Sequence, residues 1–276
     1  MPPPLQPWKK PIAANIGVTD QHPAAVAFEQ YSIDLILRSF GIGPATGISH
    51  YTSCGTKANM TAMIVALTDR LSAQGPLNPN YDPALCLGAN GEPEPYDYWR
   101  HGSVPLHVRP TVYVSPQTHA SIEKNTRNLL GVASIRRVPV TDDLRMDAKA
   151  LDQAMSGDIA SGKYLPFLVV GSVGATPSGI IDPLAEIGDV CHKHNAWFHL
   201  DAPWGGIAAF SPDLKQQCLS GLDRADSITF DPRKTLVPLG AGGAGIFLSR
   251  HRKSLSRAFN VSDSDVAPHD YAYLSL

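Results

Sequence analysis

The chain has 276 residues, of which 43% are hydrophobic and 17% charged, and its formal net charge is −2. This composition is typical of a soluble globular protein with one large core. The nearly balanced charge offers no basic surface for nucleic acid or anionic lipid, and no apolar run is long enough to span a bilayer. We therefore expect neither nucleic acid nor a membrane among its partners.

Cysteine and histidine placement argues against a disulfide framework and against a metal site. The four cysteines are scattered and form no CxxC pair: Cys54, Cys86, Cys191 and Cys218. They indicate free thiols in a reducing compartment, and the N-terminus lacks the apolar core of a signal peptide, so we expect a cytoplasmic protein. His192 and His194 cannot share a face of the helix predicted there, so we expect no metal.

The first part of the chain contains two helical segments and two segments without clear periodicity. Residues 1–23 are rich in proline and indicate an extended arm. Residues 28–40 have helical apolar spacing that ends at Gly41, and residues 56–72 have helix-forming composition. Residues 75–110 predict an unusually long loop, which either covers a site or a subunit interface or is a surface insertion.

From Thr111 onward, strand-like and helix-like segments alternate. The predicted strands cover residues 111–115, 133–138, 165–170, 196–200, 227–230 and 245–249. The predicted helices cover residues 119–130, 147–155 and 183–194. This alternation predicts an α/β fold with a mostly parallel sheet and helices on both faces. We assign residues 24–250 to one large domain and residues 251–276 to a C-terminal segment.

Lys234 and Asp201 each follow a short apolar run, so both are predicted at the carboxyl ends of strands. Open α/β sheets bind ligands at these ends. Pyridoxal 5′-phosphate (PLP) needs both residue types, because a lysine amine forms its Schiff base and a buried carboxylate keeps its pyridine nitrogen protonated. Taken alone, Lys234 is better explained as a surface lysine and Asp201 as a helix-capping aspartate, and only the agreement of further segments favours the cofactor.

Three further segments place small or polar residues at the same predicted edge of the sheet. Gly55 and Thr56 precede a helix, where backbone N–H groups favour a phosphate, although a plain N-cap has the same pattern. His119 lies at a strand-to-helix junction, where an imidazole stacks on a flat ring or moves a proton, or simply begins a helix. Thr176 follows an apolar strand and is a candidate hydrogen-bond donor to the cofactor.

Taken in order, these segments resemble the PLP-dependent group II amino-acid decarboxylases, which include glutamate, aspartate and aromatic amino-acid decarboxylases. The resemblance covers about residues 22–250. It implies the type I fold of PLP-dependent transferases, which is the fold of aspartate aminotransferase, and it implies a homodimer acting on a small amino acid.

The resemblance also implies a role for each matching residue. Lys234 would be the Schiff-base lysine, Asp201 the partner of the pyridinium, and His119 the residue stacked on the ring. Gly55 and Thr56 would hold the phosphate. Three further positions would contact the cofactor: Thr176, Ala202 as the small residue against the ring, and Arg233 beside the phosphate.

Six positions depart from the pattern of that family, one of which is Ala175, where the family has its first threonine. Arg233 stands where histidine is usual, and Asp231 replaces a common asparagine. Cys54 and Lys57 replace a glycine and a glutamate of the phosphate segment, and Pro203 interrupts the usual Asp-Ala-Ala-Trp. A permanent arginine charge suits a phosphate, so we expect Arg233 to take over the contact of the histidine.

Family members also carry an N-terminal segment and a C-terminal small domain, and we expect the chain to lack most of both. Three functions are therefore open. The first is PLP-dependent decarboxylation of an L-amino acid. The second is a PLP enzyme of altered reaction, such as an aldolase, an elimination lyase or an oxidative deaminase. The third is a catalytically degenerate paralogue with a binding or regulatory role.

Overall fold

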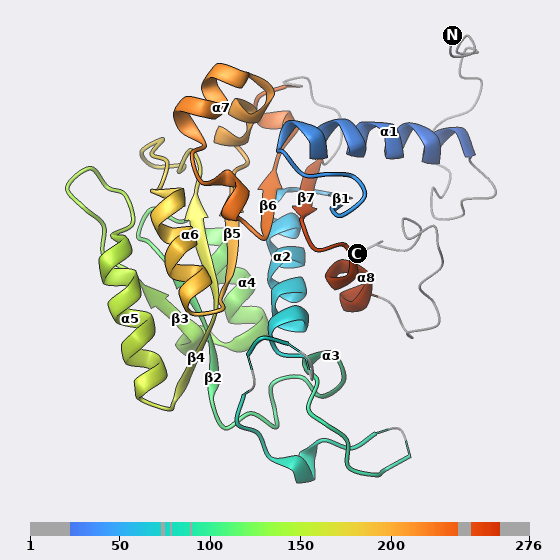
Figure 1. Cartoon of the computed structure of the whole chain (residues 1–276), viewed down its shortest axis with the longest axis vertical. Coiled ribbons are helices and arrows are strands. Elements are labelled where there is room, and N and C mark those ends of the chain that lie inside the picture. The colour runs from blue at the N-terminus through green and yellow to red at the C-terminus, as the bar shows by residue number, and fades with distance from the viewer. Residues whose placement is uncertain (1–22, 73–74, 78, 89, 237–243, 260–276) are drawn as a thin grey trace.

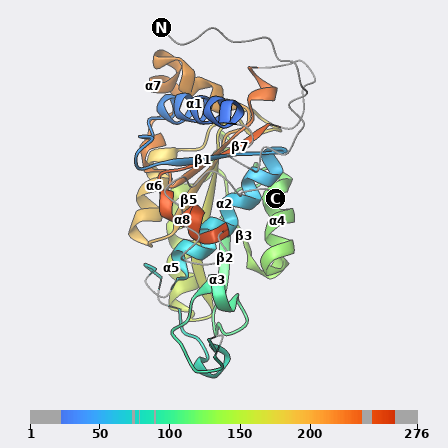
Figure 2. The ribbon, with the colours of Figure 1, turned by 90° about the vertical axis from the view of Figure 1, so that its right-hand side faces the viewer.

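The computed structural model describes residues 23–72, 75–77, 79–88, 90–236 and 244–259 (Figures 1 and 2). Of the predicted N-terminal arm, residues 1–22 lie outside this range, as do residues 260–276 of the C-terminal segment. No helix among the described residues is long and apolar enough to cross a membrane.

Strands and helices alternate along most of the described chain. The strands are β1 Ile48–Thr52, β2 Arg109–Val114, β3 Ile135–Arg137, β4 Tyr164–Ser172, β5 Trp197–Asp201, β6 Ser227–Phe230 and β7 Gly245–Ser249. The helices are α1 Pro23–Ser39, α2 Gly55–Arg70, α3 Tyr98–His101, α4 Ala120–Leu130, α5 Ala148–Ala160, α6 Leu184–Lys193, α7 Pro212–Cys218 and α8 Arg252–Phe259.

The seven described strands form one sheet in the order β1-β7-β6-β5-β4-β2-β3. Strands β6, β5, β4, β2 and β3 pair in parallel, while β7 runs antiparallel to both of its neighbours. The predicted α/β fold with a mostly parallel sheet is therefore confirmed. Residues 48–52 were not predicted as a strand, and they pair with β7, which lies almost two hundred residues further along the chain.

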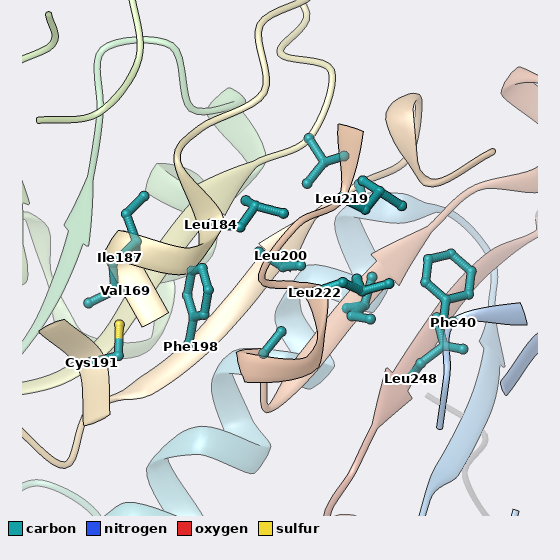
Figure 3. Packing of buried hydrophobic residues seen from close by; sticks show 14 of the residues in the cluster. Phe40, Val169, Leu184, Ile187, Cys191, Phe198, Leu200, Leu219, Leu222 and Leu248 are labelled. Carbon is teal, nitrogen blue, oxygen red and sulfur yellow. The ribbon is translucent and has the colours of Figure 1, made fainter. Parts of the chain in front are cut away.

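Side-chain alternation along β5 explains why helices cover both faces of the sheet. Phe198 and Leu200 point to one face and join the cluster that α5 and α6 cover, which Figure 3 shows from close by. Trp197 points to the other face and joins the cluster under α2, α4 and α8. Successive residues of a strand face opposite sides, so a strand with both sides apolar must be covered twice.

Helix α2 packs closely on the sheet because small side chains line its inner face. Ala58, Ala62 and Ala66 are completely buried there. At its N-terminus, Gly245 approaches so closely that a Cβ on this glycine would lie 2.2 Å from the carbonyl carbon of Cys54. The start of α2 is thus held directly against the edge where the parallel strands end.

The long segment 75–110 packs against the lower end of the sheet and contains the short helix α3. Figure 1 shows it at the bottom, whereas the arrowheads of β5 and β6 point upward. Tyr96 is 3% exposed, its ring lies 5.3 Å from that of Tyr81, and it belongs to the hydrophobic cluster under α2, so the segment packs on the main core. It therefore lies away from the edge at which the ligand site was predicted.

Candidate active site

A cavity lies at the carboxyl ends of the parallel strands, bounded by the N-termini of α2 and α4. Seven of the eight residues predicted as ligand contacts line it: Gly55, Thr56, His119, Thr176, Asp201, Arg233 and Lys234. They come from five separate segments of the chain. Segment 75–110 contributes none of the described lining residues, so it does not cover this cavity.

Ala202 is the eighth residue, and its predicted position against a bound ring is wrong. Its side chain is 2% exposed and belongs to the hydrophobic cluster of the opposite face. The alternation of β5 continues through this residue: Asp201 faces the cavity, so its neighbour faces away. Pro203, the next residue, lines the cavity instead.

Asp201 is a buried carboxylate at the end of β5, with 6% of the residue exposed. Burial raises the pKa of this carboxyl, and three groups act in the opposite direction: a hydrogen bond from Asn59, and the charges of His119 and Lys234. The bond runs from Asn59 Nδ2 to Asp201 Oδ1 at 3.1 Å. A buried acid in this position is suited to hold a proton on a ligand nitrogen.

Lys234 ends the 3₁₀ helix Pro232–Lys234, which follows β6 directly. The Asp231 side chain caps this helix by accepting a hydrogen bond from the backbone N–H of Arg233. Lys234 lines the same cavity as Asp201, and its charge acts on the Asp201 carboxyl. An amine and a carboxylate thus converge from adjacent strand ends.

The N-terminus of α2 supplies the predicted phosphate contacts. The first N–H groups of a helix have no partner within the helix, and its dipole places partial positive charge there. Cys54 is the N-cap residue, and its pKa is lowered: burial raises it, but hydrogen bonds from the backbone of Lys57 and Thr56 and from nearby hydroxyl groups outweigh burial. The same donors favour an anionic ligand group.

His119 is the N-cap of α4, and its ring is held by the first turn of that helix. Nδ1 lies 3.2 Å from the backbone nitrogen of Ser121 and 2.8 Å from its Oγ. An N-cap accepts hydrogen bonds from the N–H groups that begin the helix. The predicted junction position is therefore found, with Nδ1 turned to the backbone.

Arg233 lines the cavity but is also paired within its own turn. Its Nε and Nη2 contact Asp231 Oδ1 and Oδ2 at 3.2 and 3.0 Å. Asp231 is 2% exposed and needs such a partner. The predicted phosphate contact of Arg233 stays a prediction. The guanidinium that would make this contact is already paired with the carboxylate of Asp231.

Several lining residues were not predicted from the sequence. They are Asn59, Ser121, Ser172, Gly174, Trp204 and the substituted positions Cys54, Ala175, Pro203 and Asp231. The available signal for Asn59, which is 2% exposed, was an amide side chain between Ala58 and Met60 in a predicted helix. Ser172 aligns with Asp201 across β4 and β5, so the pairing of the strands was needed to find it.

The comparison with known families decides what kind of site this is. The model of the pyridoxal-dependent decarboxylase conserved domain matches residues 99–272, which is more than half of the chain. The chain belongs to the pyridoxal-dependent decarboxylase family. The sequence-based resemblance is thereby confirmed at the level of the family.

Individual members of the pyridoxal-dependent decarboxylase family match shorter stretches. A glutamate decarboxylase-like protein of Gibberella zeae is 44% identical over 131 residues, covering 46% of this chain and 25% of that protein. The L-2,4-diaminobutyrate decarboxylase of Acinetobacter baumannii is 30% identical over 221 residues, covering 78% of this chain and 39% of that protein.

The solved structure of mouse CSAD in its apo form superposes with a TM-score of 0.73 at 28% identity. The match covers 90% of this chain and 46% of mouse CSAD. The chain therefore spans less than half the length of these relatives.

The residues of the cavity fit PLP. Asp201 offers a buried acid for the ring nitrogen, the α2 N-terminus offers donors for the phosphate, and Lys234 offers an amine for the aldehyde. In addition, the Ser172 hydroxyl oxygen is buried in the wall of this cavity without a hydrogen-bond partner among the described residues. Buried polar atoms are normally satisfied, so this oxygen points to a polar ligand.

Proposed function

We propose that this chain is the cofactor-binding part of a PLP-dependent amino-acid decarboxylase. One observation carries the proposal: Lys234 and Asp201, which stand 33 positions apart in the sequence, line one cavity at the strand ends together with the α2 N-terminus. An amine, a buried acid and an anion site in one cavity are the groups that PLP chemistry requires.

Each residue would have a separate task. Gly55 and Thr56 would bind the phosphate through backbone N–H groups, and Asp201 would keep a proton on the pyridine nitrogen. Lys234 would bind the aldehyde group of the cofactor through Nζ. His119 would cover the ring. When bound, PLP supplies an electron-withdrawing ring next to the bond that breaks.

The proposed substrate is a small L-amino acid, which loses its carboxylate as CO₂. The relatives include a glutamate decarboxylase-like protein, an L-2,4-diaminobutyrate decarboxylase and a histidine decarboxylase. Their names agree on decarboxylation and differ in the side chain of the amino acid.

We also propose that the protein is a cytoplasmic homodimer. Phe28, Tyr31 and Leu35 lie on one side of α1 with exposed fractions of 66%, 63% and 49%. An apolar stripe of this kind is normally covered by a partner. The four free cysteines suit a reducing compartment. Light scattering at micromolar concentration would test the dimer, and a stable monomer would contradict it.

Borohydride trapping tests the cofactor assignment. The protein would be incubated with PLP, reduced with sodium borohydride and digested, and we expect mass spectrometry to find PLP on the peptide that contains Lys234. Lys234→Ala should abolish the label. Lys193→Ala is a matched control, because Lys193 pairs with Asp152 on the surface and does not line the cavity. Label retained in Lys234→Ala would refute the assignment.

A panel of L-amino acids then tests the reaction. Release of CO₂ from at least one of them, lost in Lys234→Ala, is the expected result. Trapped PLP with no CO₂ release but with another product would favour a PLP enzyme of altered reaction. Absence of both PLP binding and turnover would favour the degenerate paralogue.

A further inference from the structure

Asn59 lies at the centre of a buried hydrogen-bond chain that runs from Trp197 to Asp201. It stands on α2, in the second turn, with 2% of the residue exposed. Its Nδ2 contacts Asp201 Oδ1 at 3.1 Å and Ser121 Oγ at 3.0 Å. Its Oδ1 contacts His199 Nε2 at 3.0 Å.

The hydrogen-bond chain continues from His199 through Ser227 to Trp197. His199 Nδ1 lies 2.8 Å from Ser227 Oγ, and Trp197 Nε1 donates to the same Oγ at 2.7 Å. All three residues of this segment are completely or almost completely buried. Water does not compete for these bonds, so their direction is set by the groups themselves.

Each end of this hydrogen-bond chain can act only as a donor or only as an acceptor. An indole N–H can only donate, and an ionised carboxylate can only accept. Trp197 therefore donates to Ser227 Oγ, which leaves this oxygen free to donate to His199 Nδ1 or to accept from it. The carboxylate end sets the direction: Asp201 accepts from the NH₂ of Asn59, so Asn59 Oδ1 faces His199 Nε2 and accepts its proton. The neutral ring then accepts at Nδ1 from the Ser227 hydroxyl, and Thr229 Oγ1, 3.3 Å from Nε2, can accept from the same ring N–H.

We propose that Asn59 is a positioning residue for Asp201, and that Trp197, Ser227 and His199 act through it by fixing the orientation of its amide. A reversed amide would place Oδ1 against the Asp201 carboxylate, with two acceptors in contact. The inference rests on the proposed function, since Asp201 is there the group that holds the ring nitrogen of PLP.

The same amide also reaches the second predicted catalytic side chain. Its other N–H is donated to Ser121 Oγ, so the Ser121 hydrogen is available for His119 Nδ1, 2.8 Å away. The backbone N–H of Ser121 also donates to Nδ1. A neutral His119 ring therefore carries its proton on Nε2, the nitrogen not engaged by Ser121.

Electrostatics agree with this assignment. Burial lowers the pKa of His199 to about 3 and outweighs a hydrogen bond with the Ser227 backbone, which acts to raise it, so the ring is neutral, as the hydrogen-bond chain requires. Burial raises the pKa of Asp201, and the hydrogen bond from Asn59 is the strongest of the effects that lower it. The other charges facing Asp201 are His119 and Lys234 across the cavity.

The first test needs no cofactor. In protein labelled with ¹⁵N-histidine, we expect the His199 signals to show a proton on Nε2 and none on Nδ1. A proton on Nδ1 would overturn the proposal, because the amide would then be reversed. In Asn59→Leu, a change of similar volume, carbon NMR should show the Asp201 carboxyl titrating at least about one pH unit higher than in wild type. An unchanged titration would also overturn it.

The second test is a double-mutant cycle on PLP affinity. Asn59→Leu should weaken binding about tenfold or more, the effect of one hydrogen bond to a charged group. His199→Phe should weaken it less, and the double variant should bind as weakly as Asn59→Leu alone. Independent, additive losses would show that His199 does not act through Asn59.

The two tests also separate this proposal from the function on which it rests. If the wild-type protein fails to bind PLP, the proposed function fails, whereas the histidine spectrum and the Asp201 titration still decide the hydrogen-bond chain. If PLP binds to wild type and to Asn59→Leu with equal affinity, the function stands and the role of Asn59 is wrong.

Discussion

The guanidinium of Arg233 holds the carboxylate of Asp231, two residues earlier, through paired contacts of 3.2 and 3.0 Å. Both residues are departures from the family pattern that the sequence resembles, where histidine and asparagine are usual. Asp231 is buried and Arg233 is 36% exposed at its side chain. The charges of the acid and the base thus compensate each other within one turn.

This pairing predicts that the two substitutions are coupled in stability. Arg233→His should destabilise the protein, because it leaves a buried carboxylate with a weaker partner. Adding Asp231→Asn should recover part of the loss. We expect a coupling free energy of about 1 kcal/mol, measured by urea unfolding of wild type, both single variants and the double variant. Losses that simply add would show that the pair contributes no coupling.

The site was predictable from the sequence to the extent that strand ends were predictable. Apolar runs before Asp201 and Lys234 marked the ends of β5 and β6, and parallel strands bring such ends to one edge. The same rule does not say whether a given side chain faces the cavity or the hydrophobic core. Ala202 was misplaced because the alternation of β5 continues one residue beyond its end.

The parts of the fold and of the site that we did not predict depend on contacts between residues that are distant in the sequence. Strand β1 was missed because its partner in the described part of the sheet is the distant strand β7, and residues 48–52 have no strong local pattern of their own. Asn59 was missed because its partner Asp201 lies 142 positions away. The short helices α7 and α8 were also not predicted, since a helix of one or two turns carries little periodicity.

Asp201→Asn should stabilise the protein without cofactor at neutral pH. Burial raises the pKa of this carboxyl above its usual value of 3.8, so the folded state resists ionisation. Asparagine carries no charge and keeps an oxygen that accepts from Asn59. We expect a gain of about 1.4 kcal/mol in unfolding free energy for each unit by which the pKa is raised.

That gain should depend on pH in a defined direction. Below about pH 4 the carboxyl is protonated in both the folded and unfolded states, so wild type and variant should be equally stable. As pH rises from there, wild type should lose stability relative to the variant until the folded pKa is passed. Urea unfolding from pH 4 to 8 measures this. A difference that does not change with pH would contradict the assignment of a raised pKa.

Phe198→Ala should test the packing that supports the site from below. The Phe198 ring is completely buried between β5 and α6, near Ile187 and Cys191 in Figure 3. Removing it leaves a cavity in a dense core, so we expect a loss of about 3–5 kcal/mol in unfolding free energy. Val132→Ala is the control. Val132 is 62% exposed and lies outside the proposed dimer stripe of α1, so its truncation should change stability by less than about 0.5 kcal/mol.

The last prediction concerns the thiol at the start of α2. The pKa of Cys54 is lowered, whereas burial raises the pKa of Cys191 well above its usual value. The thiolate is the reactive form, so iodoacetamide should label Cys54 at least about tenfold faster than Cys191 in the native protein.

Cys54 lines the cavity beside Gly55 and Thr56, so a ligand at the α2 N-terminus should shield it. We expect PLP to slow its labelling several-fold, and inorganic phosphate to do so more weakly, because phosphate occupies the anion site without the ring. Peptide mass spectrometry over a time course measures both rates. In Cys54→Ser the fast label should disappear. Labelling of Cys54 at an unchanged rate in saturating PLP would place the phosphate elsewhere than at the start of α2.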